Sequence, residues 1–315
     1  MGLLILFAFA LAIIVASCAL GLIHHMQRPA RHTFAVALAR EQPTDPSAMG
    51  LVCEDHIFRF ADGTASPGWI IRGDQRDGPT VIITHGLADS RFGSLLRVPL
   101  VVGWARRVVV YDMRGHGEST ATKTTLTALE PDDLQRVMND VDDGSPIVLM
   151  GHSMGAGVSI VVASREFEEA AERKPRVVGV IAEGGYRWPM ETITNYLRHH
   201  GWPAFPAVML AGWHFSFWLG ITKHGFDRVR FAAKLRCPLL VVNGEADAVS
   251  PLASAKEVAA AAPHGRMVAV PRAGHGDLPT TYKTHYAQAL RDFVRDMQEH
   301  VNARGVETRM GVNAS

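Results

Sequence analysis

The chain has 315 residues, with 32 Lys and Arg against 31 Asp and Glu, for a formal net charge of +1. This balance excludes a general nucleic-acid-binding role, because no strong basic field is present to neutralise phosphates. The three cysteines, Cys18, Cys53 and Cys237, do not make a disulfide framework, so they leave the redox compartment open.

The first 23 residues predict a membrane helix. Residues 3–23 carry no charge and are almost wholly apolar, about the twenty residues that a helix needs to cross the hydrocarbon core. Only the terminal amine precedes this run as a positive group, which favours an uncleaved anchor over a cleaved signal peptide. Arg28, Arg31 and Arg40 follow the helix and favour a bacterial inner-membrane anchor with the domain on the cytoplasmic side.

An exported lipoprotein is the alternative interpretation of this segment. Val15-Ala16-Ser17-Cys18 resembles a bacterial lipobox, in which Cys18 becomes the acylated first residue. Residues 19–23 stay apolar, however, where a lipoprotein normally turns polar. The anchor is therefore the preferred hypothesis.

The next segment, residues 24–54, contains three prolines and is expected to be a linker from the membrane to the domain. After it, residues 56–60 and 68–72 predict an antiparallel hairpin at the start of a sheet. Together these features place the beginning of the folded domain near residue 55.

Strand-like and helix-like segments then alternate along the chain. Short apolar or β-branched runs of the kind seen in buried parallel strands occur at residues 80–84, 108–111, 147–150, 177–181, 238–242 and 267–270. Helices are expected at residues 92–105, 131–142, 154–173, 251–261 and 282–300. The alternation predicts an α/β fold over residues 55–301, with a mostly parallel twisted sheet and helices on both faces. Residues 302–315 are expected to be a disordered tail.

Gly151-His152-Ser153-Met154-Gly155 joins a predicted strand to a predicted helix. A serine becomes nucleophilic when a sharp turn presents it to a base, with amide N–H groups nearby for the developing oxyanion. The flanking glycines make such a turn sterically possible. Ser153 is therefore the candidate nucleophile. The N–H groups of Leu87, in the loop after residue 84, and Met154 are the candidate oxyanion donors.

The acid and the general base are expected in the loops that follow two later strands. Asp247 follows the strand at residues 238–242 and is the favoured acid, while Glu245 and Glu183 are rivals. His275 follows the strand at residues 267–270 and is the candidate general base. The chain has 15 histidines, and we interpret three others near strand ends as structural or rim residues: His85, His116 and His152.

The serine, acid and histidine occur in this order along the chain, which resembles the α/β-hydrolase superfamily. Residues 112–119 also closely resemble its D-x-R-G-x-G-x-S segment, which implies a role in shaping the rim of the site. The resemblance covers roughly residues 55–300 and implies the α/β-hydrolase fold. Asn243-Gly244-Glu245-Ala246-Asp247 and Ala273-Gly274-His275 are most similar to the serine-aminopeptidase, monoglyceride-lipase and Bem46-like group.

Residues 186–231 correspond in position to the lid insertion of relatives of this fold. The segment is rich in aromatic side chains, and Pro203 and Pro206 would break any long helix, so two or more short helices are expected. Our hypothesis is that Trp213, Phe217 and Trp218 contact an acyl substrate or lipid. The alternative is that they merely pack against the sheet.

The sequence favours a membrane-anchored serine hydrolase that cleaves carboxylic esters with acyl or lipid-like parts. A serine peptidase, a thioesterase or a non-catalytic binding member of the same fold are the alternatives, and fold alone does not separate them. A dehalogenase is disfavoured, because that chemistry needs a carboxylate where Ser153 stands. No cofactor is implied, and no metal is expected, because adjacent pairs such as His199-His200 seldom chelate one ion. The oligomeric state is open.

Overall fold

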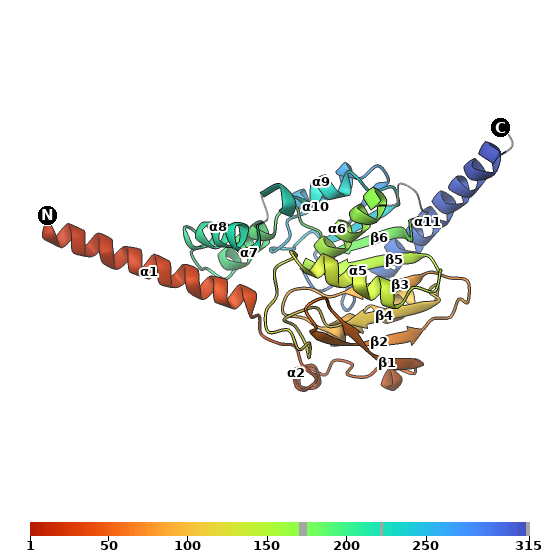
Figure 1. Ribbon diagram of the computed structural model, residues 1–315, viewed down its shortest axis with the longest axis horizontal. Coiled ribbons are helices and arrows are strands. Elements are labelled where there is room, and N and C mark those ends of the chain that lie inside the picture. The colour runs from red at the N-terminus through yellow and green to blue at the C-terminus, as the bar shows by residue number, and fades with distance from the viewer. Residues whose placement is uncertain (170–174, 221–222, 313–315) are drawn as a thin grey trace.

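The computed structural model describes residues 1–169, 175–220 and 223–312 (Figure 1). Its strands form one eight-stranded sheet in the order β1-β2-β4-β3-β5-β6-β7-β8. The strands are β1 (Cys53–Arg59), β2 (Ala65–Arg72), β3 (Thr80–Thr84), β4 (Arg107–Tyr111), β5 (Ile147–His152), β6 (Val177–Glu183), β7 (Leu239–Gly244) and β8 (Gly265–Val270). All neighbours from β4 to β8 pair in parallel, whereas β1–β2 and β2–β4 are antiparallel.

Helices cover both faces of this sheet, as predicted (Figure 1). The helices are α1 (Gly2–Gln27), α2 (Phe34–Ala39), η1 (Ser47–Met49), α3 (Arg91–Ser94), α4 (Val98–Val101), α5 (Glu130–Asp140), α6 (Met154–Glu169), α7 (Pro189–His199), α8 (Ala207–Leu219), η2 (Lys223–Phe226), α9 (Arg228–Ala232), α10 (Leu252–Ala261) and α11 (Lys283–Val312). The hairpin, the six later strands and the order of elements agree with the sequence analysis, which confirms the fold class.

Side chains at alternating positions of the central strands belong to two separate hydrophobic cores, one on each face of the sheet. Ile82 packs in the cluster that includes residues of α5, α6 and α10, whereas Val81 and Ile83 pack with residues of α3, α4 and α11. Successive side chains of a strand point to opposite faces, so a strand covered on both sides must be apolar throughout. This is why the centre of β3, Val81 to Ile83, is apolar at each position.

Three sequence expectations differ from the structure. One helix was expected over residues 92–105, but α3 and α4 are separate, and Pro99 in the first turn of α4 favours a new helix start. The expected linker, residues 24–54, contains α2 and packs on the domain, with Ala37 fully buried. The expected tail continues as helix α11 to Val312, because extending an existing helix costs less than starting one. The end of the helix expected over residues 154–173 lies outside the described residues.

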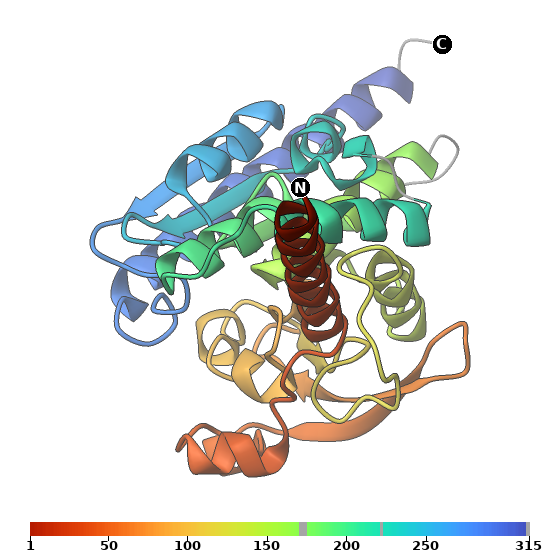
Figure 2. The ribbon, with the colours of Figure 1, turned by 90° about the vertical axis from the view of Figure 1, so that its left-hand side faces the viewer.

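Helix α1 projects from the domain beside α7 and α8 (Figures 1 and 2). It has 26 residues, and its most apolar window has a mean hydropathy of 2.9, enough by length and composition to cross a membrane. A signal sequence has the same properties. Only its last turns are buried, through Ala19, Ile23 and Met26, and these turns lie against α8. Cys18, the residue of the lipoprotein alternative, lies within this helix and is exposed.

Candidate active site

Ser153 lies at the sharp turn between β5 and α6. Its backbone φ of 50° is in the left-handed region, which non-glycine residues rarely adopt. The turn is held by the Ser153 N–H, which donates to the carbonyl of Glu183 at 2.8 Å. A Cβ on Gly155 would overlap the carbonyl of Thr84, so only glycine lets α6 pass this close to β3. The glycines of the motif thus have the steric role expected from the sequence.

Ser153, His275 and Asp247 form a continuous hydrogen-bonded chain. The Ser153 Oγ lies 2.9 Å from His275 Nε2, and His275 Nδ1 lies 2.8 Å from Asp247 Oδ2. Because a carboxylate only accepts, Nδ1 carries the proton and Nε2 is free to accept from the serine hydroxyl. The imidazole therefore has the tautomer that a general base requires.

The acid is itself fixed by its loop. Asp247 Oδ1 accepts from the N–H groups of Val249 at 2.9 Å and Ser250 at 2.7 Å, leaving Oδ2 for His275. The carboxylate is 1% exposed, whereas the His275 side chain is 23% exposed and so accessible to a substrate. These loops follow the parallel strands β7 and β8, which brings residues distant in sequence to one edge of the sheet.

The candidate oxyanion donors belong to two segments that lie next to Ser153, the start of α6 and the turn after β3. Met154 is the first residue of α6, where an N–H has no acceptor within the helix. Leu87 lies in a turn closed by the Asp89 N–H, which donates to the Gly86 carbonyl at 3.3 Å. A Cβ on Gly86 would stand 3.4 Å from the Ser153 Cβ, so this turn passes directly beside the candidate nucleophile.

The two alternative candidates for the acid, Glu183 and Glu245, do not hydrogen-bond to His275. Glu183 is fully buried and forms two hydrogen bonds to Arg97, of 2.7 and 2.6 Å. Burial raises the pKa of Glu183, but the Arg97 guanidinium outweighs it and holds that pKa below its ordinary value. Glu245 is exposed to solvent. Of the three candidate acids, only Asp247 is within hydrogen-bond distance of His275.

His85 and His116 have the contacts of structural residues. His85 Nδ1 lies 2.8 Å from the Gly86 carbonyl, and its Nε2 accepts from the Met113 N–H at 2.9 Å. Burial lowers the pKa of His85 to about 4 and that of His116 to about 3, so both are neutral at physiological pH. His85 therefore joins the ends of β3 and β4.

His152 holds the loop of the candidate base, a role that the sequence analysis did not assign. Its Nε2 lies 2.9 Å from the main-chain carbonyl of His275, so it donates and its Nδ1 is unprotonated. Burial and then Arg97 lower the pKa of His152 to about 4, although Glu183 opposes this. No local sequence pattern signals the contact, because the partner is a backbone carbonyl far along the chain.

This histidine should make stability depend on pH. Its pKa of about 4 lies below the ordinary value of 6.5, so unfolding takes up a proton between these values. The free energy of unfolding is therefore unaffected by this group above pH 6.5. It falls by about 3 kcal/mol as the pH decreases toward 4, because the folded protein resists protonation of His152. His152→Gln keeps a donor for the His275 carbonyl and does not titrate.

Urea unfolding at pH 7 and pH 4.5 measures this difference. We expect His152→Gln to become more stable relative to the wild type at the lower pH by about 2 kcal/mol or more. An equal difference in unfolding free energy at both pH values would contradict the assignment of His152 as a buried neutral group.

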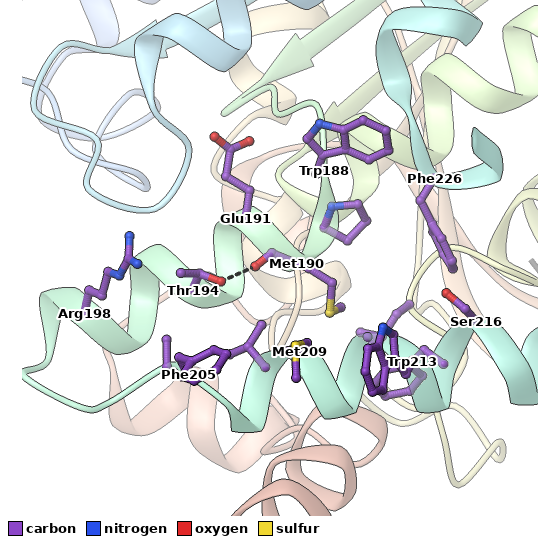
Figure 3. A pocket seen from close by; sticks show the side chains of 16 residues that line it. Trp188, Met190, Glu191, Thr194, Arg198, Phe205, Met209, Trp213, Ser216 and Phe226 are labelled. Atoms are coloured by element: carbon purple, nitrogen blue, oxygen red, sulfur yellow. Dashed lines mark hydrogen bonds between the residues drawn. The ribbon is translucent and has the colours of Figure 1, made fainter. Parts of the chain in front are cut away.

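The segment predicted as a lid forms α7, α8, η2 and α9. Helix α7 ends at His199 and α8 starts at Ala207, so the break falls around the two prolines, as expected. A cavity of about 670 Å³ lies between α7 and α8 (Figure 3). Most of its lining is apolar, and it includes Trp188, Phe205, Met209, Trp213 and Phe226.

The three aromatic residues expected to contact substrate are placed differently from one another. Trp213 lines the cavity and is also 65% exposed at the outer face of α8. Phe217 is 92% exposed and Trp218 is 47% exposed, and neither belongs to the cavity lining. The cavity wall and the outer apolar surface therefore meet at Trp213.

Within the described residues, no group of three or more His, Cys, Asp or Glu side chains is placed to hold a metal ion. The adjacent pair His199-His200 has its rings 5.3 Å apart, and His200 Nδ1 bonds the Tyr196 carbonyl at 2.8 Å.

Comparison with known proteins agrees with this architecture. The model of the alpha/beta hydrolase family matches residues 81–292, most of the sheet and all three members of the hydrogen-bonded chain. The chain belongs to the alpha/beta hydrolase family.

The curated proteins and solved structures named next are similar to this chain at low sequence identity. The Bacillus subtilis protein YqkD is 23% identical, over 70% of this chain and 72% of its own. The Xenopus tropicalis lysophosphatidylserine lipase ABHD12 is 25% identical, over 70% of this chain and 58% of its own. The solved structure of the Pyrococcus furiosus esterase Pf2001 superposes with a TM-score of 0.62 at 20% identity, covering 80% of this chain and 96% of that one. At this identity the superposition shows the fold alone.

Proposed function

We propose that this alpha/beta hydrolase is a membrane-anchored serine hydrolase that cleaves carboxylic esters with an acyl or lipid-like part. The observation that carries the proposal is the chain of two hydrogen bonds from Ser153 through His275 to Asp247, at 2.9 and 2.8 Å. Esterase and lipase neighbours in the family agree with a hydrolase.

In the proposed mechanism, His275 Nε2 takes the hydroxyl proton as Ser153 Oγ attacks the ester carbonyl carbon. The carbonyl oxygen becomes an oxyanion, which the N–H groups of Leu87 and Met154 stabilise. The protonated imidazole then passes its proton to the leaving alcohol, and an acyl-enzyme remains. Water repeats the sequence in the second half. Asp247 holds the imidazole in place and stabilises its charged form throughout.

The membrane part of the proposal rests on α1 and its contact with α8. The apolar surface of α1 continues onto the exposed outer face of α8, where Phe217 and Trp213 project. A bilayer that takes up α1 would therefore also meet this face, at the place where the cavity wall reaches the surface. Arg28, Arg31 and Arg40 favour the cytoplasmic side for the domain.

Labelling with a fluorophosphonate probe tests the activated serine. We would compare membrane fractions that contain the wild type and Ser153→Ala, and then measure hydrolysis of p-nitrophenyl esters of increasing acyl length. Labelling that depends on Ser153 supports the proposal. A folded wild-type protein that neither reacts with the probe nor hydrolyses any ester would favour a binding role instead.

We propose that the cavity between α7 and α8 takes the acyl chain, although its lining does not include Ser153, Asp247 or His275. Trp213→Ala enlarges it, so we expect the ratio of kcat/KM for long over short p-nitrophenyl esters to rise about tenfold. Phe217→Ala is the matched control, because this side chain lies on the same helix but outside the cavity lining. If the profile of the Trp213 variant matches that of the wild type, the acyl chain lies elsewhere.

A further inference from the structure

The chain that leaves α1 is attached to the domain by specific contacts. We call residues 28–33 the neck. The Arg31 guanidinium donates to the main-chain carbonyls of Gly117, Ser119 and Ala121, the second at 2.6 Å. The carbonyl of Gln27, just before the neck, accepts from the Thr124 N–H at 2.9 Å. The neck is therefore part of the folded domain.

His32, the residue after Arg31, is buried against the loop that follows β3. Its side chain is 2% exposed, and its Nδ1 lies 2.9 Å from Asp89 Oδ1 and 3.1 Å from Ser90 Oγ. Its ring meets Phe92 edge-on, with the centroids 6.3 Å apart. Because the carboxylate accepts, Nδ1 carries the proton and donates to Asp89.

Asp89 is the last residue of the turn that contains Leu87. Within this turn Ala88 has a φ of 59°, in the left-handed region, so its surroundings must hold a conformation that costs free energy. A Cβ on Gly93 would overlap the Asp89 carboxylate, which shows how closely α3 confines it from one side. His32 supplies a hydrogen bond from the neck. Burial raises the pKa of Asp89, but the hydrogen bond from His32 and the Arg97 guanidinium act against it, and that pKa is lowered.

We infer that His32 is a positioning residue for the hydrolysis proposed above: from the neck, it fixes Asp89 and with it the Leu87 N–H that faces the oxyanion. The inference rests on the proposed function. It makes the segment between anchor and domain a part of the active-site scaffold. The contact joins residues separated by 57 positions in the chain, so no motif signals it.

Two substitutions of His32 distinguish the effect of its hydrogen bond to Asp89 from the effect of its side-chain volume. His32→Leu removes the donor and keeps an apolar side chain in the site. We expect kcat for a p-nitrophenyl ester to fall about tenfold to a hundredfold, with KM within about twofold, since the lost interaction acts on the transition state. His32→Asn places an amide N–H near the position of Nδ1, and we expect it to retain most of the wild-type kcat.

An inhibitor that forms an oxyanion tests the position of Leu87 directly. Ser153 Oγ adds to the carbonyl carbon of a trifluoromethyl ketone, its proton passes to His275, and the ketone oxygen becomes the oxyanion. We expect His32→Leu to weaken this inhibitor by the same factor as kcat. The corresponding alcohol forms no oxyanion and should bind the variant and the wild type equally. A change in general stability alone would not produce this difference.

His56→Leu is the matched control. It removes another His–Asp hydrogen bond, of 2.7 Å between His56 and Asp140, at the β1 edge of the sheet, and should leave kcat unchanged. If His32→Leu does not fold, as judged by thermal unfolding, Asp89→Asn weakens the same contact and should show the same loss of kcat and inhibitor affinity.

Two results overturn the inference. One is a folded His32→Leu protein with wild-type kcat and inhibitor affinity, and the other is an equal loss of affinity for ketone and alcohol. Failure of the proposed function is distinguishable, because then the wild type itself would neither hydrolyse esters nor bind the ketone more tightly than the alcohol.

Discussion

Replacing Ser153 by alanine should lower kcat for a p-nitrophenyl ester about a millionfold, to the residual rate that binding and the oxyanion donors alone provide. The side chain lies at the turn between β5 and α6, with its Oγ 2.9 Å from His275 Nε2. No other hydroxyl is within hydrogen-bond distance of this nitrogen among the described residues. The acyl-enzyme therefore cannot form in the variant, and fluorophosphonate labelling should be lost with it.

The fold should survive this change, because alanine can occupy the same turn with one atom fewer. Ser159→Ala is the matched control: this serine is also on α6 and fully buried, but its Oγ has no hydrogen-bond partner in the described structure. We expect Ser159→Ala to retain the wild-type rate. A Ser153→Ala protein that turns over ester at the wild-type rate would overturn the assignment of the nucleophile.

Replacing Asp247 by asparagine should lower kcat about ten-thousandfold. The amide that replaces the carboxylate can present an N–H to His275 Nδ1, which favours the tautomer with the proton on Nε2 and leaves no base for Ser153. The negative charge that stabilises the imidazolium is also lost. Steady-state kinetics on a p-nitrophenyl ester measure both effects together.

Glu183→Gln is the informative comparison for the acid. It leaves Arg97 buried without its carboxylate, so we expect the free energy of unfolding to fall by about 3–5 kcal/mol. The folded fraction should nevertheless turn over ester at close to the wild-type rate, because the hydrogen bond between His275 and Asp247 is intact. An active Asp247→Asn protein together with an inactive but folded Glu183→Gln protein would show that the wrong carboxylate was chosen.

The central strands were predictable from the sequence because they are buried on both faces. A strand such as β3 then has an apolar centre, Val81 to Ile83, and that pattern is visible without any knowledge of its neighbours. Helix boundaries were less predictable. The break between α3 and α4, with Pro99 in the first turn of α4, was not expected.

The packing of the expected linker was even harder to predict from the sequence than the helix boundaries. Residues 24–54 have the prolines and polar residues of a connection between membrane and domain, and nothing local marks them as packed. Arg31 and His32 are nevertheless bonded to loops far along the chain. Charged and polar side chains are expected on a surface, so their burial becomes visible only when their partners are in place.

The sequence by itself determined the class of fold, the turn at Ser153 and the order of serine, acid and histidine, since these depend on local patterns of apolar residues, glycines and strand ends. Only the tertiary structure decided which carboxylate bonds His275, that His152 and His32 support the site, and that Trp213 but not Phe217 lines the cavity. Each of these depends on side chains that parallel strands and docked loops bring together from distant parts of the chain. The positions of these residues in the sequence do not show which of them come into contact.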